Sequence, residues 1–378
     1  MIITIQNELN EMWQDQWSTF IKSISMNGLE PESNCRSYDI DVEEGCKALI
    51  FGAICELPEK LFKESEWTCY FNNDSKEYYN VFGINDTPIA VTRSGRADTL
   101  PDSLREVPCI VLSYMSPVEI AELLAVVNPN RLTTLCFAFC NFTTDLALEP
   151  LMRFKNLKHL HISEHQEVNI PDTVMSVYPL SALKHLESLS LAGGICQKLK
   201  TIESLTKLPD LTDLALFNCP DEIDLRPLIK MPKLDELALS GSISRRNLNA
   251  ICELIQLDCL SLNMDESFQN VRPLAALTNL RSLLINGCSE VADITPLAEL
   301  QRLEELHLLG CESLINLRPL AELQNLESLL LFRCAATDVT PLARLNKLHK
   351  LVLSGCTNIT DVSPLSGMKN LKELHRVA

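Results

Sequence analysis

Hydrophobic residues in the last two thirds of the chain follow one repeating pattern. Each copy opens with the spacing L-x-x-L-x-L and recurs about every 23 residues. Regular copies begin at Leu132, Leu157, Leu186, Leu211, Leu234, Leu257, Leu280, Leu303, Leu326, Leu348 and Leu371. A degenerate copy begins at Val107, where the terminal unit of an array is expected to be atypical. This period predicts a solenoid whose units each pack against their neighbours.

Each unit divides into a strand and a short helix. The leucines of L-x-x-L-x-L should face the core, because alternate strand residues point to opposite faces. Roughly eleven parallel strands should line one concave, curved face. On the convex side, helices or turns are expected to begin near Pro227, Pro273, Pro296, Pro319, Pro341 and Pro364. The hydroxyls directly before three of these prolines are predicted to cap the helices: Thr295, Thr340 and Ser363.

Cysteine stands eight residues after the first leucine in several units: Cys140, Cys219, Cys288, Cys311, Cys334 and Cys356. Together with the strand motif and the recurring P-L-A-x-L, this resembles the cysteine-bearing, internalin-like leucine-rich repeats of bacteria, with units of 22–23 residues. The resemblance covers about residues 107–378 and implies an α/β leucine-rich-repeat solenoid. Such repeats bind unrelated partners, so it does not specify what is bound.

Residues 1–105 carry no repeat. They are expected to form an α+β N-terminal cap or small domain before a solenoid of residues 106–378. The pattern there predicts a helix over 6–25, a buried strand over 47–55, a hairpin from 67–71 and 78–84, and a strand over 88–92.

The cysteine content indicates the compartment. No run of 18 apolar residues predicts a membrane span, and residues 1–8 lack the features of a signal peptide. Fifteen cysteines in such a chain favour reduced thiols in a cytoplasm. Free cysteine is among the most buried residue types. Five ladder cysteines are therefore predicted to be buried, reduced and metal-free: Cys219, Cys288, Cys311, Cys334 and Cys356.

No motif predicts catalysis, a cofactor or a metal site. The phosphate-loop, nucleophile-elbow and H-E-x-x-H patterns do not occur. His159 and His161 share a strand face, and Cys136 lies one repeat earlier in the same column as His161. A metal or Cys–His site is the alternative interpretation. The spacing fits known zinc patterns only loosely and no third orienting group is evident, so a surface histidine pair is favoured.

The strand positions that point away from the core carry two kinds of side chain. Acidic residues follow the first leucine at Glu187, Asp213, Asp235, Glu236, Asp258, Glu304, Glu305 and Glu327. Apolar residues stand further along the strands at Phe217, Leu284, Leu309, Leu330, Phe332 and Val352. Clustered exposed apolar groups mark interaction sites, so a partner-contact surface is favoured over loose edge packing. The predicted contact residues are Phe217, Glu236, Asp258, Leu284, Glu304, Glu305, Leu309, Glu327, Leu330, Phe332 and Val352.

A net charge of −17 narrows the class of partner. It opposes binding to nucleic acid and to anionic membranes, and it favours a basic protein. The leading hypothesis is a non-catalytic, cytoplasmic binding protein, in particular a bacterial immunity protein that neutralises a basic toxin. The alternative is a leaderless secreted effector whose repeats select a host target; an enzyme within residues 1–105 ranks below both. Self-association is a further expectation, through the uncapped last unit at residues 371–378.

Overall fold

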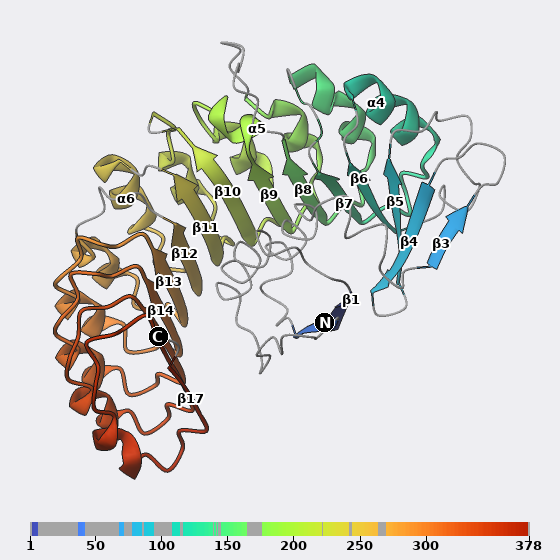
Figure 1. The fold of residues 1–378 in the computed structure, drawn as a ribbon. Coiled ribbons are helices and arrows are strands. Elements are labelled where there is room, and N and C mark those ends of the chain that lie inside the picture. Colours follow the sequence, from blue (N-terminus) through green and yellow to red (C-terminus); the bar gives the residue numbers. More distant parts are fainter. Residues whose placement is uncertain are drawn as a thin grey trace. The chain divides into compact units, whose positions relative to one another are not determined.

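The computed structural model describes two compact units, Met1–Phe217 and Asn218–Ala378 (Figure 1). The described residues are 2–6, 37–41, 68–71, 78–84, 87–93 and 108–376, except 114–115, 139, 141, 143–144, 165–175, 221, 242–243 and 264–269. The division between the units falls within the repeats, and the domain boundary near residue 105 stays a prediction.

The L-x-x-L-x-L segments of the first unit form parallel strands in sequence order (Figure 1). They are β6 (Cys109–Ser113), β7 (Thr134–Ala138), β8 (His159–Ser163), β9 (Ser188–Ala192) and β10 (Asp213–Cys219). Their leucines are buried as predicted, for example Leu157 and Leu160. Strand β6 is the degenerate copy at Val107, so the described repeats contribute twelve strands, β6 to β17, one more than the regular copies predict.

Three more strands extend this ladder from the N-terminal region. β3 (Thr68–Phe71) and β4 (Tyr78–Ile84) pair antiparallel, and β5 (Thr87–Arg93) joins β4 to the repeats by pairing parallel with β6. The predicted hairpin and the strand over 88–92 are therefore confirmed.

The start of the chain differs from the prediction. β1 (Ile2–Gln6) pairs antiparallel with β2 (Ser37–Asp41), so the helix predicted over 6–25 is wrong at Gln6. Apolar and polar residues alternate from Ile3 to Gln6, which is the period of a strand. The helix prediction did not take this alternation into account. The remainder of that helix and the strand predicted over 47–55 lie outside the described residues.

The second unit is a regular parallel ladder with no slip in register. Its strands are β11 (Glu236–Gly241), β12 (Cys259–Asn263), β13 (Ser282–Asn286), β14 (Glu305–Leu309), β15 (Ser328–Phe332), β16 (Lys350–Ser354) and β17 (Glu373–His375). The leucines opposite one another across the ladder, such as Leu283, Leu306 and Leu329, are buried. In β17, the counterpart Leu374 is 39% exposed.

Short helices connect the strands, and most are 3₁₀ rather than α-helices (Figure 1). Within the described residues, the α-helices are α4 (Pro117–Val126), α5 (Gly194–Gln197) and α6 (Arg245–Ile251). The 3₁₀ helices are η4 (Asp145–Arg153), η5 (Tyr178–Ala182), η6 (Glu203–Lys207), η7 (Arg226–Lys230), η8 (Arg272–Ala276), η9 (Thr295–Glu299), η10 (Arg318–Glu322), η11 (Thr340–Arg344) and η12 (Ser363–Gly367). The six prolines predicted to start helices all stand in the first turn of η7 to η12.

The prediction that the hydroxyls before these prolines cap the helices is wrong. Thr295 is already inside η9, and no side-chain cap is made from the residue before it. Instead, the carboxylate of Asp293 accepts a hydrogen bond from the backbone N–H of Thr295 at 2.9 Å. The same turn recurs three residues before each of the other five prolines, at Asp224, Asn270, Asn316, Asp338 and Asp361. The signal is therefore [D/N]-x-x-P, in which an Asx side chain closes the turn that leads into the helix.

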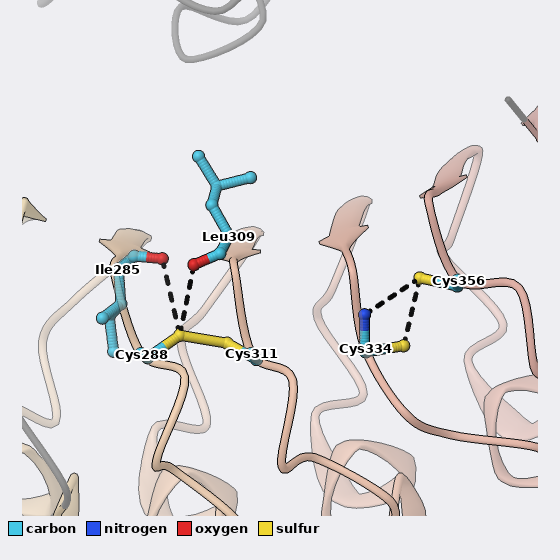
Figure 2. The surroundings of a disulfide bond; sticks show 6 residues. All are labelled: Ile285, Cys288, Leu309, Cys311, Cys334 and Cys356. Carbon is cyan, nitrogen blue, oxygen red and sulfur yellow. Dashed lines mark hydrogen bonds between the residues drawn. A yellow bond between two sulfur atoms is a disulfide. The ribbon is translucent and has the colours of Figure 1, made fainter. Parts of the chain in front are cut away.

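The prediction for the ladder cysteines is also wrong in part. Cys288 and Cys311, in neighbouring repeats, are joined by a disulfide (Figure 2). The prediction of reduced thiols is therefore wrong for this pair. It is also wrong about the burial of Cys219, which is only half-buried, whereas Cys334 and Cys356 are buried and free as predicted. Neighbouring strands of a parallel sheet lie about 4.8 Å apart, and the Cα atoms of Cys288 and Cys311 are separated by 4.8 Å. That spacing lies within the range a disulfide spans, so an uninterrupted cysteine column permits bonding.

Candidate protein-binding surface

The register of the second unit places the predicted apolar residues in two adjacent columns on the face of the sheet that points away from the leucine core. Leu284, Leu330 and Val352 occupy the middle position of β13, β15 and β16. Leu309 and Phe332 lie two residues further along β14 and β15, on the same face. We call these five residues the apolar patch.

Exposure differs within the apolar patch. Leu284, Leu330, Phe332 and Val352 are half-buried, so each presents part of its side chain at the surface. Leu309 is only 8% exposed, which corrects its prediction as a solvent-facing contact. Phe217 belongs to the other compact unit and is half-buried in the second half of β10. The structure therefore brings four of the six predicted apolar residues together as surface groups of one sheet.

Acidic residues lie where the same strands begin. The backbone N–H groups of Glu304 and Glu305 both donate to the carbonyl oxygen of Arg281, at 2.8 and 2.9 Å. Two residues that oppose one residue form a bulge, so both carboxylates lie outside the core although they are consecutive in sequence. Asp258 with Cys259, and Glu327 with Ser328, repeat this arrangement against the carbonyls of Asp235 and Glu304. Asp258, Glu304, Glu305 and Glu327, with Glu236 of β11, are called the acidic rim.

A basic side chain that the sequence reasoning omitted interrupts the acidic rim. The guanidinium of Arg281 binds both carboxylate oxygens of Glu304, at 2.8–3.0 Å. This hydrogen bonding raises the pKa of Arg281, with further contributions from the charges of Glu304, Asp258 and Glu327. Glu304 is therefore already paired. Arg281 directly follows the first leucine of its repeat, as Asp258 and Glu327 do in theirs. Collecting every residue after the first leucine, rather than the acids alone, would have revealed it.

His307 occupies the middle of β14, in register between Leu284 and Leu330. It is 7% exposed. Burial, with a smaller effect from the charge of Lys350, lowers its pKa to about 4. The ring is consequently neutral near pH 7 and continues the apolar column. Sequence reasoning missed this residue because histidine was sought as a ligand, not as part of a contact surface.

Arg333 directly follows Phe332 and has a left-handed backbone, with φ of 54°. The equivalent residues after other strands of this unit are Gly287, Gly310 and Gly355, also with positive φ. The guanidinium carbon of Arg333 lies 5.2 Å from the centre of the Phe332 ring, a cation–π contact. In the described part of the chain, no carboxylate is within ion-pair distance of Arg333. An exposed cation at a position that favours glycine is the signal that sequence reasoning could have used.

The first unit differs on the same face. Cys136, His161 and Ser190 lie in register on β7, β8 and β9, and all three are buried. Neither ring nitrogen of His161 has a hydrogen-bond partner among the residues that the structure describes, and burial lowers its pKa to about 4. The prediction of a surface histidine is therefore wrong for His161. Across the described ranges, no three His, Cys, Asp or Glu side chains are grouped to hold a metal ion.

The predicted acidic residues of the first unit form local pairs. The carboxylate of Glu187 contacts the ammonium of Lys158 at 2.7 Å, and Asp213 accepts a hydrogen bond from the hydroxyl of Ser188 at 2.8 Å. In the second unit, burial and the charge of Asp258 raise the pKa of Asp235. No helix among the described residues is long and apolar enough to span a membrane.

The repeats and their strand ladder define the class to which the chain belongs: it is a leucine-rich-repeat protein with an α/β solenoid fold. The chain is similar to a solved structure of internalin C2 from Listeria monocytogenes, with 31% sequence identity over 56% of this chain and 88% of that one, and a TM-score of 0.43. It is also similar to a leucine-rich-repeat protein from Leptospira interrogans, with 18% identity over 74% and 81% of the two chains and a TM-score of 0.41. No family model and no curated protein matches the chain.

Proposed function

We propose that this chain is a protein-binding module that holds its partner on the sheet face of the second unit. The observation that carries the proposal is the apolar patch: half-buried Leu284, Leu330, Phe332 and Val352 gather at the surface of a rigid ladder. Contiguous apolar surface on a solenoid supports an interaction site, because such folds use extended sheet faces for binding.

The proposed partner is a basic protein. The chain has a net charge of −17, and the acidic rim lies beside the apolar patch. Opposite charge at the edge of an interface accelerates association, while the desolvated centre supplies most of the affinity. The form we favour is a bacterial immunity protein that acts in the cytoplasm and neutralises a basic toxin without catalysis. The alternative form is a secreted effector whose repeats select a host protein.

The test uses surface variants in a partner search. The parent chain and Phe332→Ala, each carrying an affinity tag, would be incubated with extract from the native organism, and captured proteins would be compared by quantitative mass spectrometry. Ile315→Ala is a matched control, because Ile315 is 64% exposed outside the strands and its loss leaves the apolar patch intact.

We expect a basic protein that is retained by the parent and by Ile315→Ala but depleted with Phe332→Ala. Equal capture by all three chains would contradict binding through the apolar patch. To separate the two forms of the proposal, the captured protein would be expressed alone and together with this chain. Growth arrest relieved by this chain supports immunity, whereas export of the chain in a secretion assay supports the effector form.

A further inference from the structure

Four consecutive repeats carry cysteine at the same position: Cys288, Cys311, Cys334 and Cys356. The first two are joined by a disulfide, and their Cα atoms are 4.8 Å apart. Cys334 and Cys356 are related by the same step of one repeat, since β15 and β16 pair in parallel register just before them. Backbone spacing in this column is therefore compatible with a second bond between neighbouring rungs.

The sulfur atoms of Cys334 and Cys356 are already in contact (Figure 2). Their Sγ atoms are 3.1 Å apart, and the backbone N–H of Cys334 donates to the Sγ of Cys356 at 3.4 Å. Two donors thus point at the sulfur of Cys356. The hydrogen bond from the Cys334 thiol is the largest cause that lowers the pKa of Cys356, to about 7, whereas the pKa of Cys334 is raised. The two thiols consequently differ in character: Cys356 is the better nucleophile.

We propose that Cys334 and Cys356 form an oxidisable pair, in which a small hydroperoxide reacts at Cys356 and Cys334 completes a second disulfide beside Cys288–Cys311. In the first step, the Cys356 thiolate attacks one oxygen of hydrogen peroxide. The O–O bond breaks, hydroxide leaves, and Cys356 becomes a sulfenic acid. In the second step, Cys334 loses its proton and attacks the Cys356 sulfur. The S–O bond breaks, water leaves, and the S–S bond forms. Two thiols are oxidised by two electrons and one peroxide is reduced to two waters.

Burial selects the class of oxidant. Cys334 is 4% and Cys356 5% exposed. A bulky small-molecule disulfide cannot approach a sulfur with so little surface, because exchange requires in-line access to the attacked atom. Hydrogen peroxide is about the size of two water molecules and neutral, so the local fluctuations that admit water also admit it.

The new bond would reinforce the part of the ladder that carries the proposed binding surface. Cys334 follows Phe332 and Arg333 directly, and Cys356 follows β16, which carries Val352. A disulfide here closes a loop of about one repeat, which restricts the unfolded chain. We expect oxidation to raise the Tm by roughly 5–10 °C.

Peptide mapping of the full-length protein tests the proposal. Protein treated with hydrogen peroxide would be blocked with iodoacetamide and digested with trypsin without reduction. Cleavage after Arg333, Arg344, Lys350 and Lys369 places Cys334 and Cys356 in separate peptides. We expect a species equal to both peptides less two hydrogens, appearing with peroxide and absent after treatment with a reductant. Alkylated Cys334 and Cys356 after peroxide, or sulfinic acid at Cys356 without a cross-link, would overturn the proposal.

Single variants test the separate roles of the two sulfurs. With Cys334→Ser, which keeps a hydroxyl donor beside Cys356 but has no thiol, Cys356 should accumulate as a sulfenic acid that dimedone traps, because its resolving thiol is missing. With Cys356→Ala, Cys334 should stay a thiol that dimedone does not label. The opposite labelling would refute the assignment of roles. Cys140→Ala is the matched control, since Cys140 is a buried thiol that donates to the carbonyl of Leu112, and its loss should leave the cross-link unchanged. Circular dichroism would confirm that each variant is folded; if Cys334→Ser is unfolded, Cys334→Thr replaces it, because it also keeps a hydroxyl donor.

Discussion

At the scale of single residues, Arg333 is the clearest case of a side chain placed against local preference. A left-handed backbone costs a residue with a Cβ atom roughly 1–2 kcal/mol. Gly287, Gly310 and Gly355 avoid this cost at the equivalent positions. Arg333 stacks on Phe332, a residue of the apolar patch, so the proposed partner contact would offset this cost.

The first prediction follows from this conflict. Arg333→Gly should raise the free energy of unfolding by about 0.5–1 kcal/mol, because relief of strain exceeds the added entropy of the unfolded chain. The same variant should weaken partner binding. Urea denaturation and a binding assay, performed on the same preparation, measure both effects.

Gly310→Ala is the reciprocal control. A Cβ atom at Gly310 would meet only the backbone nitrogen of Gly287 at 3.9 Å, so the substitution introduces strain without a clash. It should destabilise by about 1 kcal/mol. If Arg333→Gly is instead less stable than the parent, strain is not the dominant effect and the cation–π contact stabilises the fold.

Two buried histidines give a prediction about pH. His161 and His307 both have pKa values lowered to about 4, with burial as the main cause. Each is neutral when folded, but in the unfolded chain each takes up a proton below its ordinary pKa of about 6.5. Stability is therefore complete above that pH and declines as the pH falls from about 6.5 to 4. The full loss is about 3 kcal/mol for each histidine.

His307→Leu separates this effect from the titration of carboxylates. Leucine continues the column of Leu284 and Leu330 and has no proton to bind. Denaturant unfolding at pH 7 and pH 4.5 should show a smaller loss of stability for the variant than for the parent. An identical loss in both proteins would contradict the lowered pKa. His161→Leu provides the equivalent comparison in the first unit.

At the scale of elements, the 3₁₀ helices depend on the Asx turns that precede them. The pKa values of Asp293, Asp338 and Asp361 are lowered by hydrogen bonds from the residue two positions later. These turns recur in six repeats, so an Asp or Asn three residues before the proline is a regular position of the repeat motif. The carboxylates of Asp293 and Asp338 favour the ionised form because they accept hydrogen bonds from a threonine hydroxyl and, with a smaller effect, from the backbone N–H of the same residue; for Asp361 the backbone N–H of Ser363 has the larger effect.

Replacing Asp293 tests this interpretation. Asp293→Ala removes the acceptor and should lower the Tm, whereas Asp293→Asn keeps an acceptor oxygen and should stay close to the parent. Thr295→Ala retains the backbone bond to Asp293 and should have the smaller effect of the two alanine variants. Thermal unfolding measures all three. A larger loss for Thr295→Ala would restore the hydroxyl as the essential cap.

The elements also show which features a sequence can predict. The leucine spacing of L-x-x-L-x-L predicts strands reliably, since only one register buries every leucine. The position eight residues after the first leucine likewise predicts the cysteine column. It does not predict that Cys288 bonds to Cys311 while Cys334 and Cys356 stay free, because each of these cysteines has a cysteine at the same position of a neighbouring repeat. Burial of His161 was missed for a related reason: alternation along β8 assigns its face, but not what covers that face.

At the scale of the whole molecule, charge and apolar surface have separate roles in the proposed binding. The net charge of −17 acts over distances near the Debye length and accelerates encounter with a basic partner. The apolar patch acts only after contact, when water leaves the interface. Charges at the rim should therefore affect mainly the association rate, and the patch should affect mainly the dissociation rate.

The pairing within the acidic rim determines which charges to change. Glu304 is bound by the guanidinium of Arg281, so its effect on the surrounding field is partly cancelled. The charge reversal Glu305→Lys should slow association and weaken its dependence on salt. Glu304→Gln should change the rate less, because it changes the net charge by one, whereas Glu305→Lys changes it by two. Phe332→Ala should instead speed dissociation, at a cost of about 2 kcal/mol if Phe332 is a hot spot.

Binding kinetics at two salt concentrations would distinguish these effects once a partner is known, with Ile315→Ala as the control that leaves both groups intact. The proposal requires the two kinds of variant to separate: slower, less salt-dependent association for Glu305→Lys, and faster dissociation for Phe332→Ala. If both bind as the parent does, the partner does not dock on this face. If both affect only association, the apolar patch is not desolvated in the complex, and the contact is a charge-driven encounter at its edge.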